Sequence, residues 1–213
     1  MAEIIALPDG HMTAITYLVV LPDQVLLIDP TTPVRHLPPN LPPIRRILAT
    51  HGHIDHIYQA DAWRRLSGAP LAIHDADRDC LTDPGRNLSA LISNARTFAP
   101  AQETLAHGQV IDLDTAHQLT IWHTPGHTSG SCCFLLDEDG KPRALFSGDT
   151  LFAGSVGRTD LGGDTATLMR SLRFLAVRAG HLATDETHDL AVYPGHGPVT
   201  GLAREIRSNP YFP

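Results

Sequence analysis

The chain has 213 residues, of which 42% are hydrophobic and 18% are charged, and its formal net charge is −7 at pH 7. This is the composition of an ordinary globular protein that is long enough to bury a substantial core. The negative charge and the lack of any Lys/Arg block in the sequence argue against a nucleic-acid partner and against binding to a membrane surface.

Three cysteines occur, and two of them, Cys132 and Cys133, are adjacent within an apolar run. An odd number of cysteines is not typical of a disulfide framework and favours a reducing compartment. We expect the adjacent pair to be buried structural thiols rather than ligands. The N-terminus has no basic segment, and no apolar run is long enough to span a bilayer, so the sequence predicts a cytoplasmic protein.

Short apolar runs alternate with turn residues over the first half of the chain, a pattern that predicts strands with one helix among them. Pro8-Asp9-Gly10 predicts a turn, and His11 follows it in a loop at the mouth of a cleft or in solvent. The proline-rich stretch 30–43 is expected to be irregular, and the segment 75–98 mainly helical with a break around Asp83-Pro84-Gly85. The predicted strands are two or three within 4–28, then 44–49 and 71–74, and the predicted helix is 57–66, ending at Gly68.

In the second half, residues 165–177 have apolar positions at helical spacing, and Asp139-Gly140 is a hairpin signal. We find no repeat and no linker, and therefore predict a single mixed α/β domain over 1–213. The predicted strands are 110–113, 118–123, 132–136, 144–147 and 190–193, and the predicted helices are 165–177 and 202–208.

The most distinctive stretch is Thr50-His51-Gly52-His53-Ile54-Asp55-His56, directly after the strand predicted at 44–49. Neutral imidazoles bind divalent metals, and Asp adds an anionic oxygen. On an extended segment residues i and i+2 point the same way, so His51 and His53 can converge on one ion. Asp55 and His56, displaced by the next turn, would then lie at a second point nearby. The alternative is an incidental His-rich tract.

Three further candidates argue against an incidental tract. Each lies at the end of a predicted strand beside Gly or Pro, where the backbone can approach a ligand closely. They are His127 after Pro125-Gly126, Asp149 after Ser147-Gly148, and His196 after Pro194-Gly195. Such groups, collected on loops at one edge of a rigid sheet, are what an active site needs.

The combined pattern resembles that of the metallo-β-lactamase superfamily and, within it, the glyoxalase II-like (hydroxyacylglutathione hydrolase-like) hydrolases. The resemblance implies an α/β fold, a four-layer αββα sandwich of two mixed sheets flanked by helices, with two metal ions at one edge. It also implies how the ligands are shared. His51, His53 and His127 hold the first ion, Asp55, His56 and His196 hold the second, and Asp149 bridges them.

The resemblance implies two divalent ions, zinc first and iron or manganese as alternatives, that share a hydroxide to attack a thioester. Bound metal lowers the pKa of water from about 15.7 towards ~7, so no Ser, Cys or Lys nucleophile is required. A thiolate of pKa about 8.5 leaves with little need for a proton, whereas an amide nitrogen needs an acid, and none is evident. The expected partner is a small-molecule thioester such as an S-2-hydroxyacylglutathione, and the candidate catalytic residues are Asp55, Asp149 and Arg158.

The segment from Gly148 to Asp160 is similar to the loop after the bridging Asp in glyoxalase II and in persulfide dioxygenases. Arg158 matches a basic substrate-binding residue of glyoxalase II. Its guanidinium either binds a substrate carboxylate in a bidentate manner or polarises a carbonyl group, or it has a structural role in which it pairs with Asp160 or caps a loop. Asp160 stands where glyoxalase II has tyrosine, and we expect no separate C-terminal glutathione-binding helical domain. The identity of the thiol carrier is therefore left open. The sequence also leaves open whether the protein is a monomer or a homodimer.

Hydrolysis is favoured over a second hypothesis, a mononuclear iron persulfide dioxygenase. That enzyme class shares the tetrad Gly157-Arg158-Thr159-Asp160 and would hold iron through His51, His127 and Asp149. Lactone or β-lactam hydrolysis and a metal-binding protein without activity are weaker alternatives.

Overall fold

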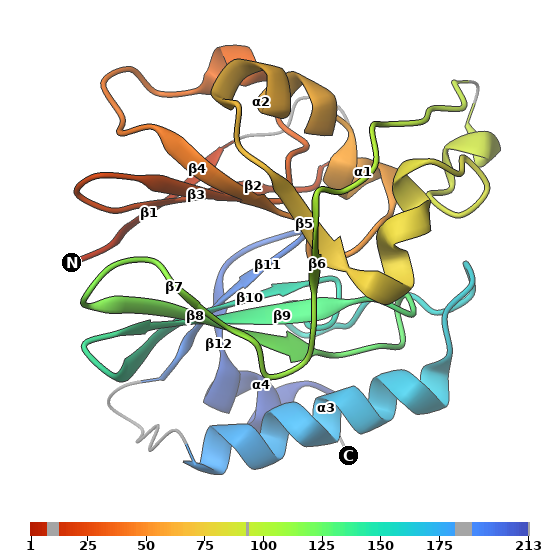
Figure 1. The fold of residues 1–213 in the computed structure, drawn as a ribbon. Coiled ribbons are helices and arrows are strands. Elements are labelled where there is room, and N and C mark those ends of the chain that lie inside the picture. The colour runs from red at the N-terminus through yellow and green to blue at the C-terminus, as the bar shows by residue number, and fades with distance from the viewer. Residues whose placement is uncertain (8–12, 93, 182–188, 213) are drawn as a thin grey trace. The chain divides into compact units, whose positions relative to one another are not determined.

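The computed structural model describes residues 1–7, 13–92, 94–181 and 189–212. The chain divides into two compact units, residues 1–105 and 106–213, each built on a six-stranded sheet (Figure 1). The turn predicted at Pro8-Asp9-Gly10 and the following His11 lie outside the described residues. That residues 1–213 form a single domain stays a prediction.

The sheet of the first unit has the order β1-β2-β3-β4-β5-β6. Its first three strands form an antiparallel meander, and the next three join in parallel, so crossover segments separate them. Ile28 pairs with Leu48, and the residues that follow these two strands are therefore neighbours at one sheet edge. The strands are β1 Glu3–Leu7, β2 Thr16–Val20, β3 Val25–Ile28, β4 Ile44–Leu48, β5 Leu71–His74 and β6 Glu103–Leu105.

The helices of the first unit are short. α2 packs against β4, and its fully buried Trp63 donates an indole N–H to the carbonyl oxygen of Thr32 at 2.8 Å. Gly68 ends α2 at φ +70°, a conformation that glycine adopts without steric cost. The elements are α1 Ile54–Ile57, α2 Ala60–Ser67 and the 3₁₀ turns η1 Val34–His36, η2 Asp75–Leu81 and η3 Ser89–Leu91.

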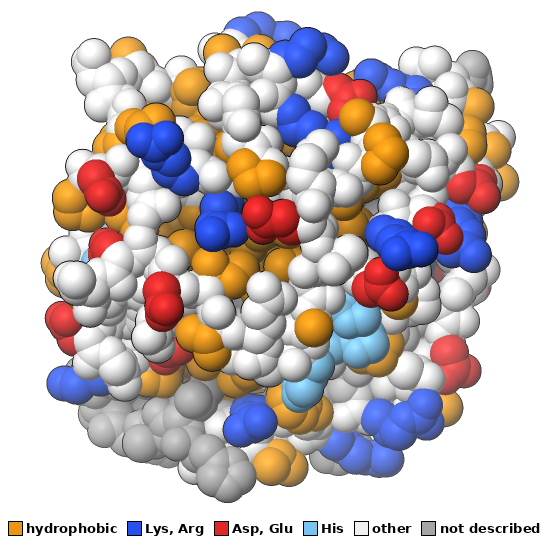
Figure 2. Space-filling model, viewed as in Figure 1, with side chains coloured by type: hydrophobic (Ala, Val, Ile, Leu, Met, Phe, Trp, Pro, Cys, Tyr) orange, Lys and Arg blue, Asp and Glu red, His pale blue; other side chains and the backbone are white. Residues whose placement is uncertain are grey.

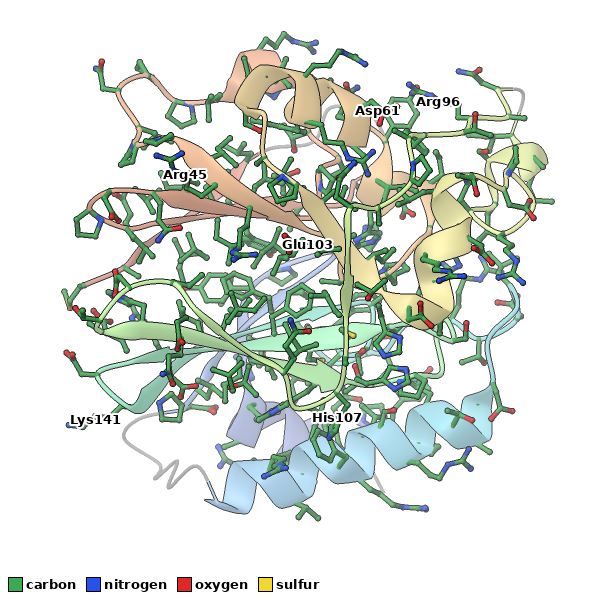
Figure 3. The ribbon with its side chains drawn as sticks, viewed as in Figure 1. Arg45, Asp61, Arg96, Glu103, His107 and Lys141 are labelled. Carbon is green, nitrogen blue, oxygen red and sulfur yellow. The ribbon has the colours of Figure 1, made fainter. Side chains whose placement is uncertain are left out.

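The prediction that 75–98 is mainly helical is wrong, because side chains there bond to backbone groups that a helix would use. Asn87 donates to the carbonyl oxygen of Cys80 at 2.8 Å, and Ser89 exchanges bonds with the backbone of Arg96. The guanidinium of Arg96 lies 4.3 Å above the ring of Tyr58. Asp61, labelled with Arg96 in Figure 3, accepts the N–H of Ala99 at 3.3 Å. These contacts hold a non-helical segment against α2.

The sheet of the second unit has the order β12-β11-β10-β9-β8-β7. Its pairs are antiparallel except β10 with β11, which run parallel because α3 connects them. The strands are β7 Val110–Asp112, β8 His117–His123, β9 Cys132–Glu138, β10 Lys141–Gly148, β11 Ala191–Pro194 and β12 Thr200–Gly201.

Helices α3 (Thr165–His181) and α4 (Leu202–Ser208) lie on the same face of the second sheet (Figure 1). Asp164 caps α3 by accepting the N–H of Thr167 at 2.7 Å. Leu172 of α3 and Leu202 of α4 belong to one buried apolar cluster. His107 lies against α3, with its ring 5.5 Å from that of Phe174 (Figure 3).

Most predicted elements are present, and two have the predicted bounds, the strand 71–74 and the helix 202–208. The helix predicted at 57–66 is two helices, since residues 58–59 turn between α1 and α2. The short strands β6 and β12 were not predicted. They have three and two residues, which are too few to show the alternation of apolar and polar residues that identifies a strand.

Basic and acidic side chains are interspersed over the face shown in Figure 2 and form no extended patch of a single charge sign there. Within the described ranges, no helix has both the length and the apolar character that crossing a bilayer requires.

Candidate metal centre

The predicted ligands of the first unit follow β4 and lie close together. His51 and His53 are on the segment that links β4 to α1, and His53 is the N-cap residue of α1. The ring centroid of His51 lies 4.9 Å from that of His53 and 4.1 Å from that of His56. Nε2 of His56 lies 3.9 Å from a carboxylate oxygen of Asp55. The structure therefore brings all four predicted ligands of this unit together.

Gly52, between two of these histidines, lies in a space that admits no side chain. A Cβ at this position would be 2.3 Å from Cβ of Cys80. The Gly52 N–H donates to a carboxylate oxygen of buried Asp77 at 3.0 Å. The 3₁₀ turn η2 therefore supports the backbone that carries His51 and His53.

Asp29 is a site residue that sequence reasoning missed. It follows β3, has a backbone φ of +53° and is 1% exposed. One carboxylate oxygen accepts the N–H of Thr50 at 2.7 Å, and the other accepts the Thr50 hydroxyl at 2.9 Å and Nδ1–H of His56 at 2.8 Å. The hydroxyl of Thr16 donates to the Asp29 carbonyl oxygen at 2.6 Å and fixes this backbone.

These bonds set the proton positions on two predicted ligands. His56 donates from Nδ1, so its Nε2 carries a lone pair. The Thr50 hydroxyl directs its proton to Asp29, and its oxygen can therefore accept Nδ1–H of His51 at 3.1 Å. Both rings thus offer Nε2 to a metal, with the other nitrogen held by a protein acceptor, as is usual for metal-ligating histidines.

The predicted ligands of the second unit meet around one carboxylate. An oxygen of Asp149 lies 3.4 Å from Nε2 of His127 and 3.6 Å from Nε2 of His196. Two donors that share a tetrahedral ion at about 2.05 Å are themselves about 3.3 Å apart. Each of the two imidazole nitrogens is therefore at a distance from the Asp149 carboxylate that suits two ligands of one divalent ion.

The loop after β10 orients His127. Nδ1–H of His127 donates to the carbonyl oxygen of Arg158 at 2.7 Å, which again leaves Nε2 for a metal. Gly157 makes this approach sterically feasible. A Cβ there would be 2.0 Å from the carbonyl oxygen of Asp149 and 3.0 Å from Nδ1 of His127. The ring of Phe152, on the same loop, lies 5.9 Å from the imidazole of His196 in an edge-to-face arrangement.

Arg158 forms the second of its two predicted interactions, the ion pair with Asp160. Its Nε and Nη2 donate to the two carboxylate oxygens at 2.6 and 2.5 Å. The hydrogen bond from Arg158 lowers the pKa of Asp160 to about 2. The pair is exposed, so water competes for both groups and the guanidinium can still reach other partners.

The three cysteines are buried and form no disulfide, as predicted for Cys132 and Cys133. Burial raises the pKa of Cys80 to about 12 and that of Cys133 to about 11. Neither thiol is therefore a thiolate at neutral pH, and a cysteine nucleophile finds no support in these two residues.

The model of the metallo-β-lactamase superfamily matches residues 14–196 of this chain. The chain belongs to the metallo-β-lactamase superfamily. Members of this superfamily bind divalent metals, and the chain is a metal-dependent hydrolase whose His and Asp clusters are candidate ligands for such ions. The predicted fold class, two mixed sheets flanked by helices, is confirmed.

Curated relatives carry names of differing precision. An uncharacterized protein of Mycobacterium bovis, Mb2612c, is 40% identical over 78% of this chain and 75% of its own length. The probable metallo-hydrolase YqgX of Bacillus subtilis is 32% identical over 97% of this chain and 95% of its own. The hydroxyacylglutathione hydrolase GloC of Haemophilus influenzae is 30% identical over 79% of this chain and 76% of its own.

Solved structures share the fold over nearly the whole chain. The B3 metallo-β-lactamase BLEG-1 has a TM-score of 0.84 at 31% identity and covers 98% of this chain and 99% of its own. TTHA1623, solved in a di-iron-bound form, has a TM-score of 0.79 at 31% identity, and the match covers 98% of this chain and 100% of that one. ETHE1 from Myxococcus xanthus has a TM-score of 0.72 at 27% identity, covering 98% and 83%.

Proposed function

We propose that this chain is a binuclear hydrolase that cleaves the thioester of a small thiol, with an S-2-hydroxyacylglutathione as the model substrate. The observation that carries the proposal is the Asp149 carboxylate, one oxygen of which lies 3.4 and 3.6 Å from the Nε2 atoms of two imidazoles. A carboxylate in that position can bind two ions at once. The name of the GloC relative supports a thioester of glutathione as the substrate.

In the proposed centre, His51, His53 and His127 hold one ion, Asp55, His56 and His196 the other, and Asp149 bridges them. Zinc is the first expectation, with iron or manganese as alternatives. Bound divalent ions lower the pKa of water from about 15.7 to about 7 and polarise a carbonyl group.

The chain's own groups then need to do little acid–base work. Water oxygen bonds to the acyl carbon, the carbon–sulfur bond breaks, and sulfur leaves with the electron pair as a thiolate. One proton of the water is released to solvent as the acid product ionises, and the other protonates the departed thiolate. Because a thiol has a pKa of about 8.5, this leaving group needs no dedicated acid. In this proposal Arg158 binds the anionic end of the substrate through the part of its guanidinium that does not contact Asp160.

The test is release of free thiol from S-lactoylglutathione by protein loaded with zinc, with metals per chain counted by elemental analysis. We expect about two metals per chain. His53→Ala should reduce thiol release to background, because it removes a predicted ligand. His107→Ala is the matched control: it is the same substitution at an exposed histidine outside the ligand set, and it should leave activity unchanged. Absence of turnover by fully metallated protein on a panel of thioesters would refute the proposal.

The alternative is a mononuclear iron persulfide dioxygenase, and the structural similarity to ETHE1 is compatible with it. Oxygen uptake with glutathione persulfide, together with one iron per chain, would favour it over hydrolysis. The similarity to BLEG-1 keeps β-lactam hydrolysis as a weaker alternative, and a β-lactam belongs in the substrate panel.

A further inference from the structure

Two polar side chains, one on α4 and one at its C-cap, bind the loop between β10 and α3. Glu205, 2% exposed, accepts the N–H of Gly154 at 2.8 Å and the hydroxyl of Thr200 at 2.6 Å. Asn209, 4% exposed, donates from Nδ2 to the carbonyl oxygen of Ser155 at 3.0 Å and to Glu205 at 2.9 Å. The last helix of the chain is therefore connected to this loop by hydrogen bonds.

Apolar packing does not account for a carboxylate at position 205. Burying a carboxylate costs free energy unless hydrogen bonds replace its hydration. Helix α4 already has apolar contacts with the core of the second unit through Leu202. The donors to Glu205 are neutral groups, and one of them is the backbone N–H of Gly154, so this carboxylate fixes where the loop lies.

The bound segment is a small hairpin next to two predicted ligands. Phe152 and Ser155 exchange backbone hydrogen bonds at 3.0 and 3.3 Å, and Gly154 completes the turn at φ +69°. The hairpin carries the ring that contacts His196, and three residues after it comes the carbonyl group that accepts the proton of His127. A displacement of the hairpin would therefore change the orientation of both imidazoles.

We infer that Glu205 and Asn209 are positioning residues of the metal centre. They hold the hairpin 152–155, and through it the rings of His127 and His196. The inference rests on the proposed metal centre, but it does not depend on which bond the enzyme cleaves.

The test compares zinc binding with local backbone order. Glu205→Ala and Asn209→Ala should each weaken zinc binding about tenfold, the lower end of the 10–100-fold effect of direct partners of metal ligands. Zinc affinity is measured by competition with a chromophoric chelator. In the metal-free variants, amide hydrogen exchange over 151–158 should be faster than in wild type. Glu205→Gln keeps an acceptor for the Gly154 N–H, and its amide can donate to the Thr200 hydroxyl, so it should restore most of the affinity.

Ser208→Ala is the matched control, because it removes a 2.9 Å hydrogen bond from α4 that involves no loop residue. It should change neither zinc affinity nor exchange. Wild-type zinc affinity in both alanine variants would overturn the inference, as would weaker binding with unchanged exchange over 151–158. If Glu205→Ala does not fold, the zinc affinity and the amide exchange of Asn209→Ala and Glu205→Gln test the inference in its place. If the wild type cleaves no thioester while these zinc effects are found, the substrate proposal fails and this inference stands.

Discussion

Replacing Asp29 by Asn should weaken metal binding without unfolding the protein. In the wild type, one Asp29 oxygen accepts the Thr50 N–H, and the other accepts the Thr50 hydroxyl and Nδ1–H of His56. An asparagine that keeps its oxygen at the Thr50 N–H places its NH₂ where the second oxygen was. The NH₂ then donates to Nδ1 of His56 and to the Thr50 hydroxyl, which in turn donates to Nδ1 of His51. Both rings then carry their proton on Nε2, where a metal cannot bind.

Metal binding forces the opposite amide orientation, in which the NH₂ group faces the N–H of Thr50. That orientation leaves a buried donor unsatisfied, which costs about 1–3 kcal/mol. Zinc affinity should therefore fall by about 5- to 150-fold. This range contains the 10–100-fold loss that is typical when a hydrogen-bond partner of a metal ligand is changed. In the metal-free protein the first orientation satisfies the amide at position 29 and both polar groups of Thr50, so the melting temperature should change little.

Zinc affinity is measured by chelator competition, and the tautomers of His51 and His56 by ¹H–¹⁵N NMR of the metal-free protein. Asp114→Asn is the matched control, because Asp114 also accepts Nδ1–H of a histidine, His117, at 2.8 Å, and that histidine is not a predicted ligand. It should leave zinc affinity unchanged. Wild-type zinc affinity in Asp29→Asn would refute the reasoning, and so would metal-free rings still protonated at Nδ1.

Three further changes test other parts of the structure. Gly157→Ala places a Cβ 2.0 Å from the carbonyl oxygen of Asp149, so we expect loss of bound zinc after gel filtration; full occupancy would contradict this. Burial raises the pKa of Asp114, but hydrogen bonds from Ala116 and His117 outweigh it and lower the pKa below 3.8. The stability this carboxylate adds is present above pH 3.8 and lost as the pH falls through its folded value, so Asp114→Ala should lower the melting temperature more at pH 7 than at a pH well below 3.8. An equal loss at both pH values would exclude this account. Asp160→Asn removes the charge paired with Arg158, which leaves the guanidinium available to the substrate. KM for an anionic thioester should therefore fall about two- to fivefold with kcat unchanged. An unchanged KM would argue against Arg158 as a substrate contact.

The candidate ligands can be selected from the sequence because their residue types and spacing are local. His51 and His53 are two residues apart on an extended segment, and Asp149 follows a strand at a glycine. The segment 75–98 could not be predicted in the same way. Its composition favours a helix, but side-chain hydrogen bonds of Asn87 and Ser89 and the left-handed backbone of Leu88 at φ +68° prevent one. The spacing of apolar residues in the sequence does not reveal these features.

Asp29 shows a second limit of the sequence pattern. It lies 21 residues before Thr50, and the two meet only because β3 and β4 pair in parallel, with Ile28 opposite Leu48. Because two parallel strands are joined by a crossover connection, no short-range sequence pattern predicts the contact between Asp29 and Thr50. Its positive φ is tolerated by Asp better than by most residues, but this too is visible only in the folded chain.

In both units the acceptor that orients a ligand comes from outside that ligand's motif. Asp29 at the end of β3 holds His56, and the Arg158 carbonyl group holds His127. The ligand types are set by the motifs, whereas the nitrogen that each ring presents is set by these acceptors. A chain that keeps all seven predicted ligands but changes Asp29 should therefore keep its fold and lose metal affinity. Motif matching alone would count such a chain as intact, and only the tautomer and affinity measurements would distinguish it.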